Sequence, residues 1–206
     1  MMKIPTSEQA ASMLAEAEQL NPGAWAEHSR FAAKAARSIA EHCPGLDAEC
    51  AYTLALLHDI GRRYGVSDLR HGLDGYNYLM GLGFDDAARI CITHSYPLQD
   101  IRTNGENWDG TAEELNWLTI YLESVTYTKY DRLVQLCDGL ALPEGYCLME
   151  KRMVDVCIRR GVNDYTVEKW KAFFQIVQEF NQLSCGNIYT YLPGVVENTF
   201  GFSPAG

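Results

Sequence analysis

Three histidines of this 206-residue chain fall on the apolar faces of predicted helices. His28, His58 and His94 each extend a stripe of apolar residues at three- and four-residue spacing, which is the pattern of a buried helix face. A lone histidine on such a face is more often a hydrogen-bonded core residue than a ligand. Here, however, Asp59 directly follows His58. Buried neutral imidazoles beside a carboxylate are well satisfied by a shared divalent cation, so the pattern predicts a metal site.

The elements that must position these side chains are predicted to be helices. Apolar residues recur at three- and four-residue spacing through most of the chain, and no segment alternates for long with period two, which indicates an all-α fold. Residues 97–110 form a long polar loop, and a loop of that length is more often functional than idle. The expected helices are 6–20, 24–42, 47–61, 71–80, 85–95, 111–142, 143–160 and one from Asp164 or Thr166 to about 186.

Composition narrows the classes of partner. The chain has 17 Lys and Arg against 27 Asp and Glu, a formal net charge of −10. Such a charge repels phosphate backbones and anionic lipid, so neither polymeric nucleic acid nor a membrane surface is an expected partner. No apolar run approaches the length of about 18 residues that spans a bilayer, and the N-terminus lacks the signal-peptide pattern. We therefore expect a cytoplasmic protein. The seven cysteines include no CxxC pair, so none is expected to bind metal.

The dipeptide His58-Asp59, within LALLHDIGRR, carries a resemblance to a known family. The sequence resembles the HD-domain metal-dependent phosphohydrolase superfamily, whose pattern is a histidine on one helix, a His-Asp pair on a later helix and an aspartate on a still later one. His28 and Asp138 stand at the outer positions of this pattern. The resemblance implies a single HD-type domain over 1–206: a helical bundle with a core at about 24–142, additional C-terminal helices at about 143–186 and an irregular tail at 187–206.

His71 and His94 narrow the resemblance to one subclass of the family. The order H…HD…H…H…D is similar to that of HD proteins that hold two metals, often iron, with the aspartate of the pair bridging them. The resemblance implies one metal on His28, His58, Asp59 and Asp138, and a second on Asp59, His71 and His94. Asp131 stands one heptad before Asp138, on a similar helix face, and is the alternative last ligand. Asp138 is favoured because apolar residues surround it in the sequence.

An anionic substrate in an acidic protein requires local positive charge. Arg62, Arg63 and Arg70 cluster just after the His-Asp pair and are the candidate substrate-binding cations. In the family, the basic residue after the HD-x-G turn is often near substrate phosphate, which assigns Arg62 a catalytic role beside Asp59. Trp108 in the long loop is a further candidate contact for the substrate, since exposed indoles are uncommon.

The expected function is metal-dependent hydrolysis of a phosphate ester or anhydride of a small molecule, such as a nucleotide, by metal-activated hydroxide. No GxSxG or GxxxxGK[ST] motif offers another mechanism. The expected cofactor is one or two divalent ions, iron, manganese, cobalt or another, because a His and carboxylate set suits all of them. Two alternatives stay open: an HD-type di-iron oxygenase and a non-catalytic nucleotide-binding module. The sequence leaves the oligomeric state open.

Overall fold

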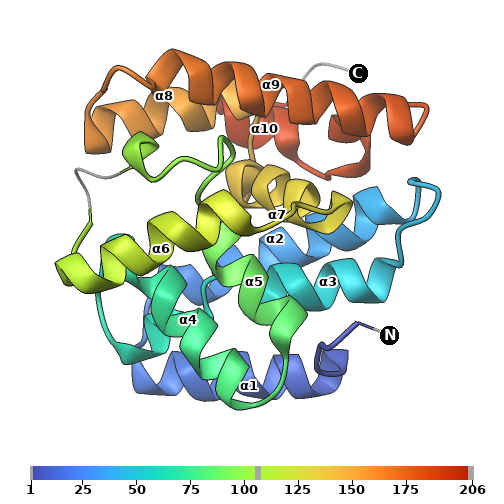
Figure 1. Ribbon diagram of the computed structural model, residues 1–206. Coiled ribbons are helices and arrows are strands. Elements are labelled where there is room, and N and C mark those ends of the chain that lie inside the picture. The colour runs from blue at the N-terminus through green and yellow to red at the C-terminus, as the bar shows by residue number, and fades with distance from the viewer. Residues whose placement is uncertain (1, 105–107, 204–206) are drawn as a thin grey trace.

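The computed structural model describes residues 2–104 and 108–203. Over these residues the chain is all-α, as predicted, with ten α-helices, three short 3-10 helices and one small hairpin (Figure 1). The helices are α1 (Ser7–Leu20), α2 (Ala24–Ala40), α3 (Ala48–Leu56), α4 (Arg70–Gly81), α5 (Asp85–Thr93), α6 (Ala112–Ser124), α7 (Lys129–Leu140), α8 (Met149–Arg160), α9 (Thr166–Leu183) and α10 (Val195–Phe200). The shorter elements are η1 (Ile60–Tyr64), η2 (Ile101–Thr103), η4 (Ile188–Tyr191), β1 (Ala141–Leu142) and β2 (Gly145–Tyr146).

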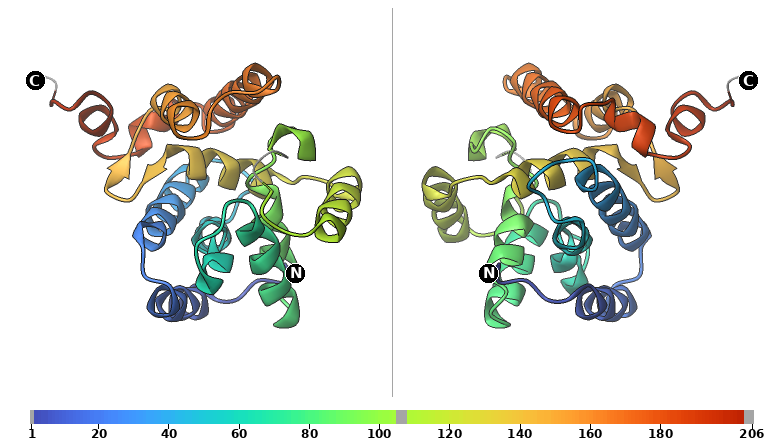
Figure 2. Two further views of the ribbon diagram at one scale, coloured as in Figure 1. Left: turned by 90° about the vertical axis from the view of Figure 1, so that its left-hand side faces the viewer. Right: turned by 90° about the vertical axis from the view of Figure 1, so that its right-hand side faces the viewer.

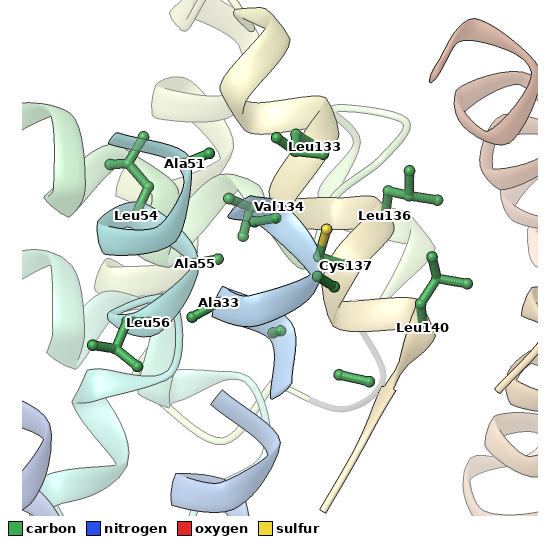
Figure 3. Close-up of a cluster of buried hydrophobic side chains, with 14 of the residues drawn as sticks. Ala33, Ala51, Leu54, Ala55, Leu56, Leu133, Val134, Leu136, Cys137 and Leu140 are labelled. Carbon is green, nitrogen blue, oxygen red and sulfur yellow. The ribbon is translucent and has the colours of Figure 1, made fainter. Parts of the chain in front are cut away.

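Helix α2 packs against both α3 and α7 at the centre of the fold. Its buried face is rich in alanine, and small side chains allow neighbouring helices to approach closely. Figure 3 shows Ala33 of α2 facing Ala55 of α3 and Val134 of α7. All three side chains are fully buried. This tight contact places α2 and α7, which carry His28 and Asp138, beside α3, which leads into the turn of His58 and Asp59.

Helices α8, α9 and α10 form a layer on the side of α7 opposite α1 (Figures 1 and 2). Met149 of α8 and Phe180 of α9 belong to the same hydrophobic cluster as the residues of α2, α3 and α7. The C-terminal helices therefore pack on the core and supply a wall above it.

Four expected boundaries were wrong. The helix predicted over 47–61 ends at Leu56, so His58 lies in the turn after α3 and not on the helix. The predicted helix over 111–142 is two helices, because Thr128 and Asp131 form a capping box that begins α7 anew. Pro143 does not start a helix; it lies in the β1–β2 hairpin, where Gly145 adopts a positive φ of 153°. The tail is not irregular throughout, since η4 and α10 occupy part of it.

Gly61 permits the contact between η1 and α4. A Cβ at this position would lie 1.9 Å from the His71 carbonyl oxygen and 2.4 Å from the Gly75 nitrogen, both of them backbone atoms. We expect Gly61→Ala to lower the free energy of unfolding by about 3 kcal/mol, because the backbone of α4 would have to move. Denaturant titration measures this. Gly81→Ala is the control, since a Cβ there meets nothing within 4 Å. Equal stability of the two variants would contradict the prediction.

Candidate metal centre

The six predicted ligands come from five parts of the fold and meet at one place. His28 lies in α2 and Asp138 in α7, while His58 and Asp59 occupy the turn between α3 and η1. The other two ligands are at helix ends: His71 is in the first turn of α4, and His94 directly follows α5. All four histidines and Asp59 are buried, and Asp138 is half-buried.

One half of the cluster groups His28, His58 and Asp138. The Asp138 Oδ1 lies 2.9 Å from His28 Nε2 and 3.7 Å from His58 Nε2. One ligand atom from each of the three residues lies within 4.8 Å of the others, as the ligands of a single ion do. Asp59 borders this group, with its Oδ2 3.9 Å from His58 Nε2.

The other half groups His71 and His94 around the second oxygen of Asp59. The Asp59 Oδ1 lies 2.9 Å from His71 Nε2 and 3.6 Å from His94 Nε2. The two imidazole Nε2 atoms are 3.4 Å apart. Asp59 therefore stands between the two halves, with one carboxylate oxygen directed to each.

Backbone carbonyls orient all four imidazoles. The Nδ1 atoms of His28, His58, His71 and His94 lie 3.2, 2.6, 2.5 and 3.2 Å from the carbonyl oxygens of Ala141, Ala55, Asp68 and Ile90. A carbonyl only accepts, so each Nδ1 donates and each Nε2 presents a lone pair to the centre of the cluster. The His58 Nε2 is fully buried without a hydrogen-bond partner among the described residues. Such an orphaned acceptor is costly, and a bound cation would satisfy it.

The charges of the cluster also fit a cation. Burial opposes ionisation of Asp59, but the charges of Arg62, His71 and His58 hold its pKa well below the ordinary value. Burial lowers the pKa of His94 to about 3, so its imidazole is neutral at neutral pH. At His58 burial acts in the same direction, yet the Asp59 and Asp138 carboxylates raise its pKa. The cluster therefore favours positive charge at this point, from either a proton or a metal ion.

Of the four predicted substrate-binding residues, the structure brings only Arg62 to the centre. Its Nε donates to Asp59 Oδ2 over 2.6 Å. Arg63 points away and stacks on Tyr78, with the guanidinium carbon 4.0 Å from the ring centroid. Arg70 pairs instead with Glu114 over 3.1 Å and with Asp74 over 3.5 Å. The Trp108 Nε1 donates to the Thr111 carbonyl over 3.0 Å. Arg63, Arg70 and Trp108 do not line the cavity described below.

Asp131, the alternative last ligand, lies away from the cluster. Its Oδ1 accepts from Thr93 Oγ1 at 2.7 Å and from Arg89 Nε at 3.1 Å. Its Oδ2 accepts from the backbone nitrogen and the hydroxyl of Thr128, both at 2.7 Å. These donors occupy both oxygens, so Asp131 ties α7 to α5 and is not placed to bind the metal.

A cavity of about 570 Å³ opens over the cluster. His28, Asp59, Arg62, His71, His94 and Asp138 line its base. The opposite wall comes from α8 and α9 and includes Met153, Lys169, Trp170 and Phe173. These wall residues were not among the predicted site residues, because they lie beyond the stretch that resembles the family. Their helical periodicity alone does not show which face meets a cavity.

The family model of the HD domain matches residues 25–142. This match covers more than half of the chain, which therefore belongs to the HD-domain family, the metal-dependent phosphohydrolase superfamily. No curated protein and no solved structure matches the chain. Among the described residues, no helix is both long and apolar enough to cross a bilayer.

Proposed function

We propose that this protein hydrolyses a phosphate ester or anhydride of a small molecule, with divalent metal ions held by the His and Asp cluster. The observation that carries the proposal is the position of Asp59 between two groups of Nε2 lone pairs, at the base of a cavity. The cavity volume lies within the range of about 300–1,000 Å³ typical of small-molecule sites. Its size and the acidic surface both favour a small substrate over a polymer.

We assign one ion to His28, His58, Asp59 and Asp138, and a second to Asp59, His71 and His94. Bound divalent ions would neutralise the charge of the substrate phosphate. They would also lower the pKa of bound water, so that hydroxide is available as the nucleophile near neutral pH. The carbonyl hydrogen bonds keep each imidazole in the tautomer and orientation that a ligand requires. Iron, manganese and cobalt all suit this donor set.

Arg62 supplies a fixed positive charge beside the proposed ions. Asp59 orients its guanidinium from one side, and its Nη1 donates to the Ser67 carbonyl at 3.2 Å. The guanidinium borders the cavity, where it can donate to a phosphate oxygen without ordering a flexible side chain first. Electrostatic stabilisation of this kind contributes most where the donor is already in place.

An HD-type di-iron oxygenase is the second candidate. The nitrogen-rich half formed by His71 and His94 with Asp59 favours it, because iron that activates oxygen is often held by imidazole and carboxylate. A non-catalytic nucleotide-binding module is less well supported, since all six positions of the ligand pattern are present and converge.

Metal content and phosphate release test the proposal together. We expect purified protein to bind about two ions per chain. We also expect it to release phosphate from some members of a panel of sugar phosphates and nucleotides, with or without oxygen. Elemental analysis and a phosphate assay under anaerobic conditions measure the two quantities, with chelator-treated protein as the control. Oxygen uptake without phosphate release would favour the oxygenase. If the protein bound no metal and released no phosphate after addition of iron, manganese or cobalt, this would falsify both the hydrolase and the oxygenase hypothesis.

A further inference from the structure

Lys169 differs from the other cationic side chains that line the cavity. The four arginines each lie within 4 Å of a carboxylate: Arg62 near Asp59, Arg152 and Arg159 near Asp155, and Arg160 near Asp68. Within residues 2–104 and 108–203, Lys169 has no carboxylate partner at that distance. Within that part of the chain no carboxylate offsets its charge, whereas each arginine charge is at least partly balanced.

The Lys169 ammonium has few partners for a side chain that is only partly exposed. Its one side-chain hydrogen bond among the described residues runs from Nζ to Asn104 Oδ1, over 2.6 Å. An ammonium carries three donors, so two remain for other partners. Burial lowers the pKa of Lys169, which reflects the cost of keeping this charge from water. An anion bound in the cavity would repay that cost.

A chain of hydrogen bonds connects Lys169 to one side of the metal centre. Asn104, which accepts from Lys169, donates its own Nδ2 to the Ser95 carbonyl over 2.7 Å. Ser95 in turn places its Oγ 3.0 Å from His94 Nε2. Lys169 itself makes no hydrogen bond or ion pair with any of the six predicted ligands. It is therefore fixed relative to His94 but is not part of the ligand cluster.

The wall that carries Lys169 also includes apolar side chains. Trp170 and Phe173 follow on the same helix, and Met153 comes from α8; all three line the cavity. A cavity with carboxylates and imidazoles at its base, apolar side chains on its wall and a separate cation matches a molecule with an organic middle and two charged ends.

We propose that Lys169 binds a second anionic group of the substrate, distinct from the phosphate at the metal centre. The ligand class is a small organic phosphate that carries another phosphate or a carboxylate. That the ligand is a substrate rests on the proposed function. The chemical class of the ligand rests on the cavity and on Lys169 alone.

Binding measurements on the full chain, with its metal bound, test the inference. The probes are phenyl phosphate, with one anionic group, fructose 1,6-bisphosphate, with a second phosphate at the other end of the sugar, and 3-phosphoglycerate, with a carboxylate. Lys169→Gln removes the charge but keeps a donor for Asn104, so the wall is disturbed little. Lys171→Gln is the matched control, because Lys171 lies on the same helix, is exposed, pairs with Glu168 at 3.8 Å and does not line the cavity.

We expect Lys169→Gln to raise the Kd of fructose 1,6-bisphosphate, of 3-phosphoglycerate or of both by about ten- to a hundredfold, the loss typical of a charged hydrogen bond. The Kd of phenyl phosphate should change less than about twofold, and Lys171→Gln should match wild type. Lys169→Arg, which keeps the charge, should retain most of the affinity. The probe that responds identifies the second group as phosphate or carboxylate.

Three results would overturn the inference. They are unchanged affinities in Lys169→Gln, an equal loss for phenyl phosphate, and wild-type protein that binds neither two-anion probe more tightly than phenyl phosphate. The inference and the proposed function fail separately. A protein that hydrolyses no phosphate compound but shows the Lys169-dependent pattern would refute the hydrolase and keep the ligand class. If Lys169→Gln changed neither phosphate hydrolysis nor the affinities, the proposed hydrolase would stand and the inference about Lys169 would be refuted.

Discussion

Asp59→Ala is expected to abolish metal binding and phosphate hydrolysis together. The Asp59 carboxylate has one oxygen 2.9 Å from His71 Nε2 and the other 3.9 Å from His58 Nε2, so its loss removes a ligand from both halves of the cluster. It also frees the Arg62 guanidinium to repel a cation in the same space. Catalysis should fall by at least about a thousandfold, because several kcal/mol of transition-state stabilisation depend on bound metal. Elemental analysis and phosphate release measure the two effects.

A fold defect must be separated from this result. Removing one member of a buried ion pair destabilises a protein by roughly 3–5 kcal/mol, and Asp59 pairs with Arg62. Asp59→Asn keeps the shape and should show the same metal loss with a smaller change in unfolding free energy. Asp74→Asn is the control carboxylate: it pairs with Arg70 and lies outside the cavity lining. Full activity or full metal content in Asp59→Ala would refute the whole site assignment.

Local signals in the sequence mark the starts of α1 and α3. Thr6 and Gln9 have the spacing of a capping box and form one: the Thr6 hydroxyl accepts from the Gln9 nitrogen at 3.2 Å, and the Gln9 side chain accepts in return at 2.9 Å. Asp47 likewise begins α3, by accepting from the Cys50 nitrogen. Such caps involve residues three positions apart, so the sequence contains all the information that they require.

The break between α6 and α7 has a local and a distant cause. Thr128 and Asp131 are three positions apart and form a capping box, a local signal that the prediction of one long helix over 111–142 overlooked. Asp131 also accepts hydrogen bonds from Arg89 and Thr93 of α5. Only this second anchor depends on the fold, because it joins residues that are distant in the sequence.

The candidate site also has a part that could be predicted from the sequence and a part that could not. The convergence of His28, His58-Asp59 and Asp138 could be expected because the pattern of residue types resembles a family. The cavity wall could not, since Lys169 meets Asn104 across 65 positions of the sequence. Proximity in the sequence also misled: Arg63 follows Arg62 but stacks on Tyr78, because consecutive residues of a 3-10 helix point in different directions.

Asp138→Asn is expected to lose metal and keep its stability, whereas Asp131→Asn is expected to lose stability and keep its metal, although both acids lie in α7. Asp138 contacts His28 Nε2 at 2.9 Å and borders the cavity, so its substitution should reduce bound metal by about one ion per chain and hydrolysis by roughly a hundredfold or more. Stability should change little, since the NH₂ group of an asparagine can donate to the lone pair of His28 Nε2. The second group, on Asp59, His71 and His94, should keep its ion.

Asp131 is fully buried and its two carboxylate oxygens accept four hydrogen bonds, one of them from the Arg89 guanidinium. Asparagine would place an NH₂ donor against these donors and leave Arg89 without its buried partner. We expect Asp131→Asn to lower the unfolding free energy by about 3 kcal/mol while the folded fraction keeps its metal. Denaturant titration and elemental analysis on both variants measure the contrast. Metal loss in Asp131→Asn at unchanged stability would make Asp131 the ligand, because only a metal role separates binding from folding in that way.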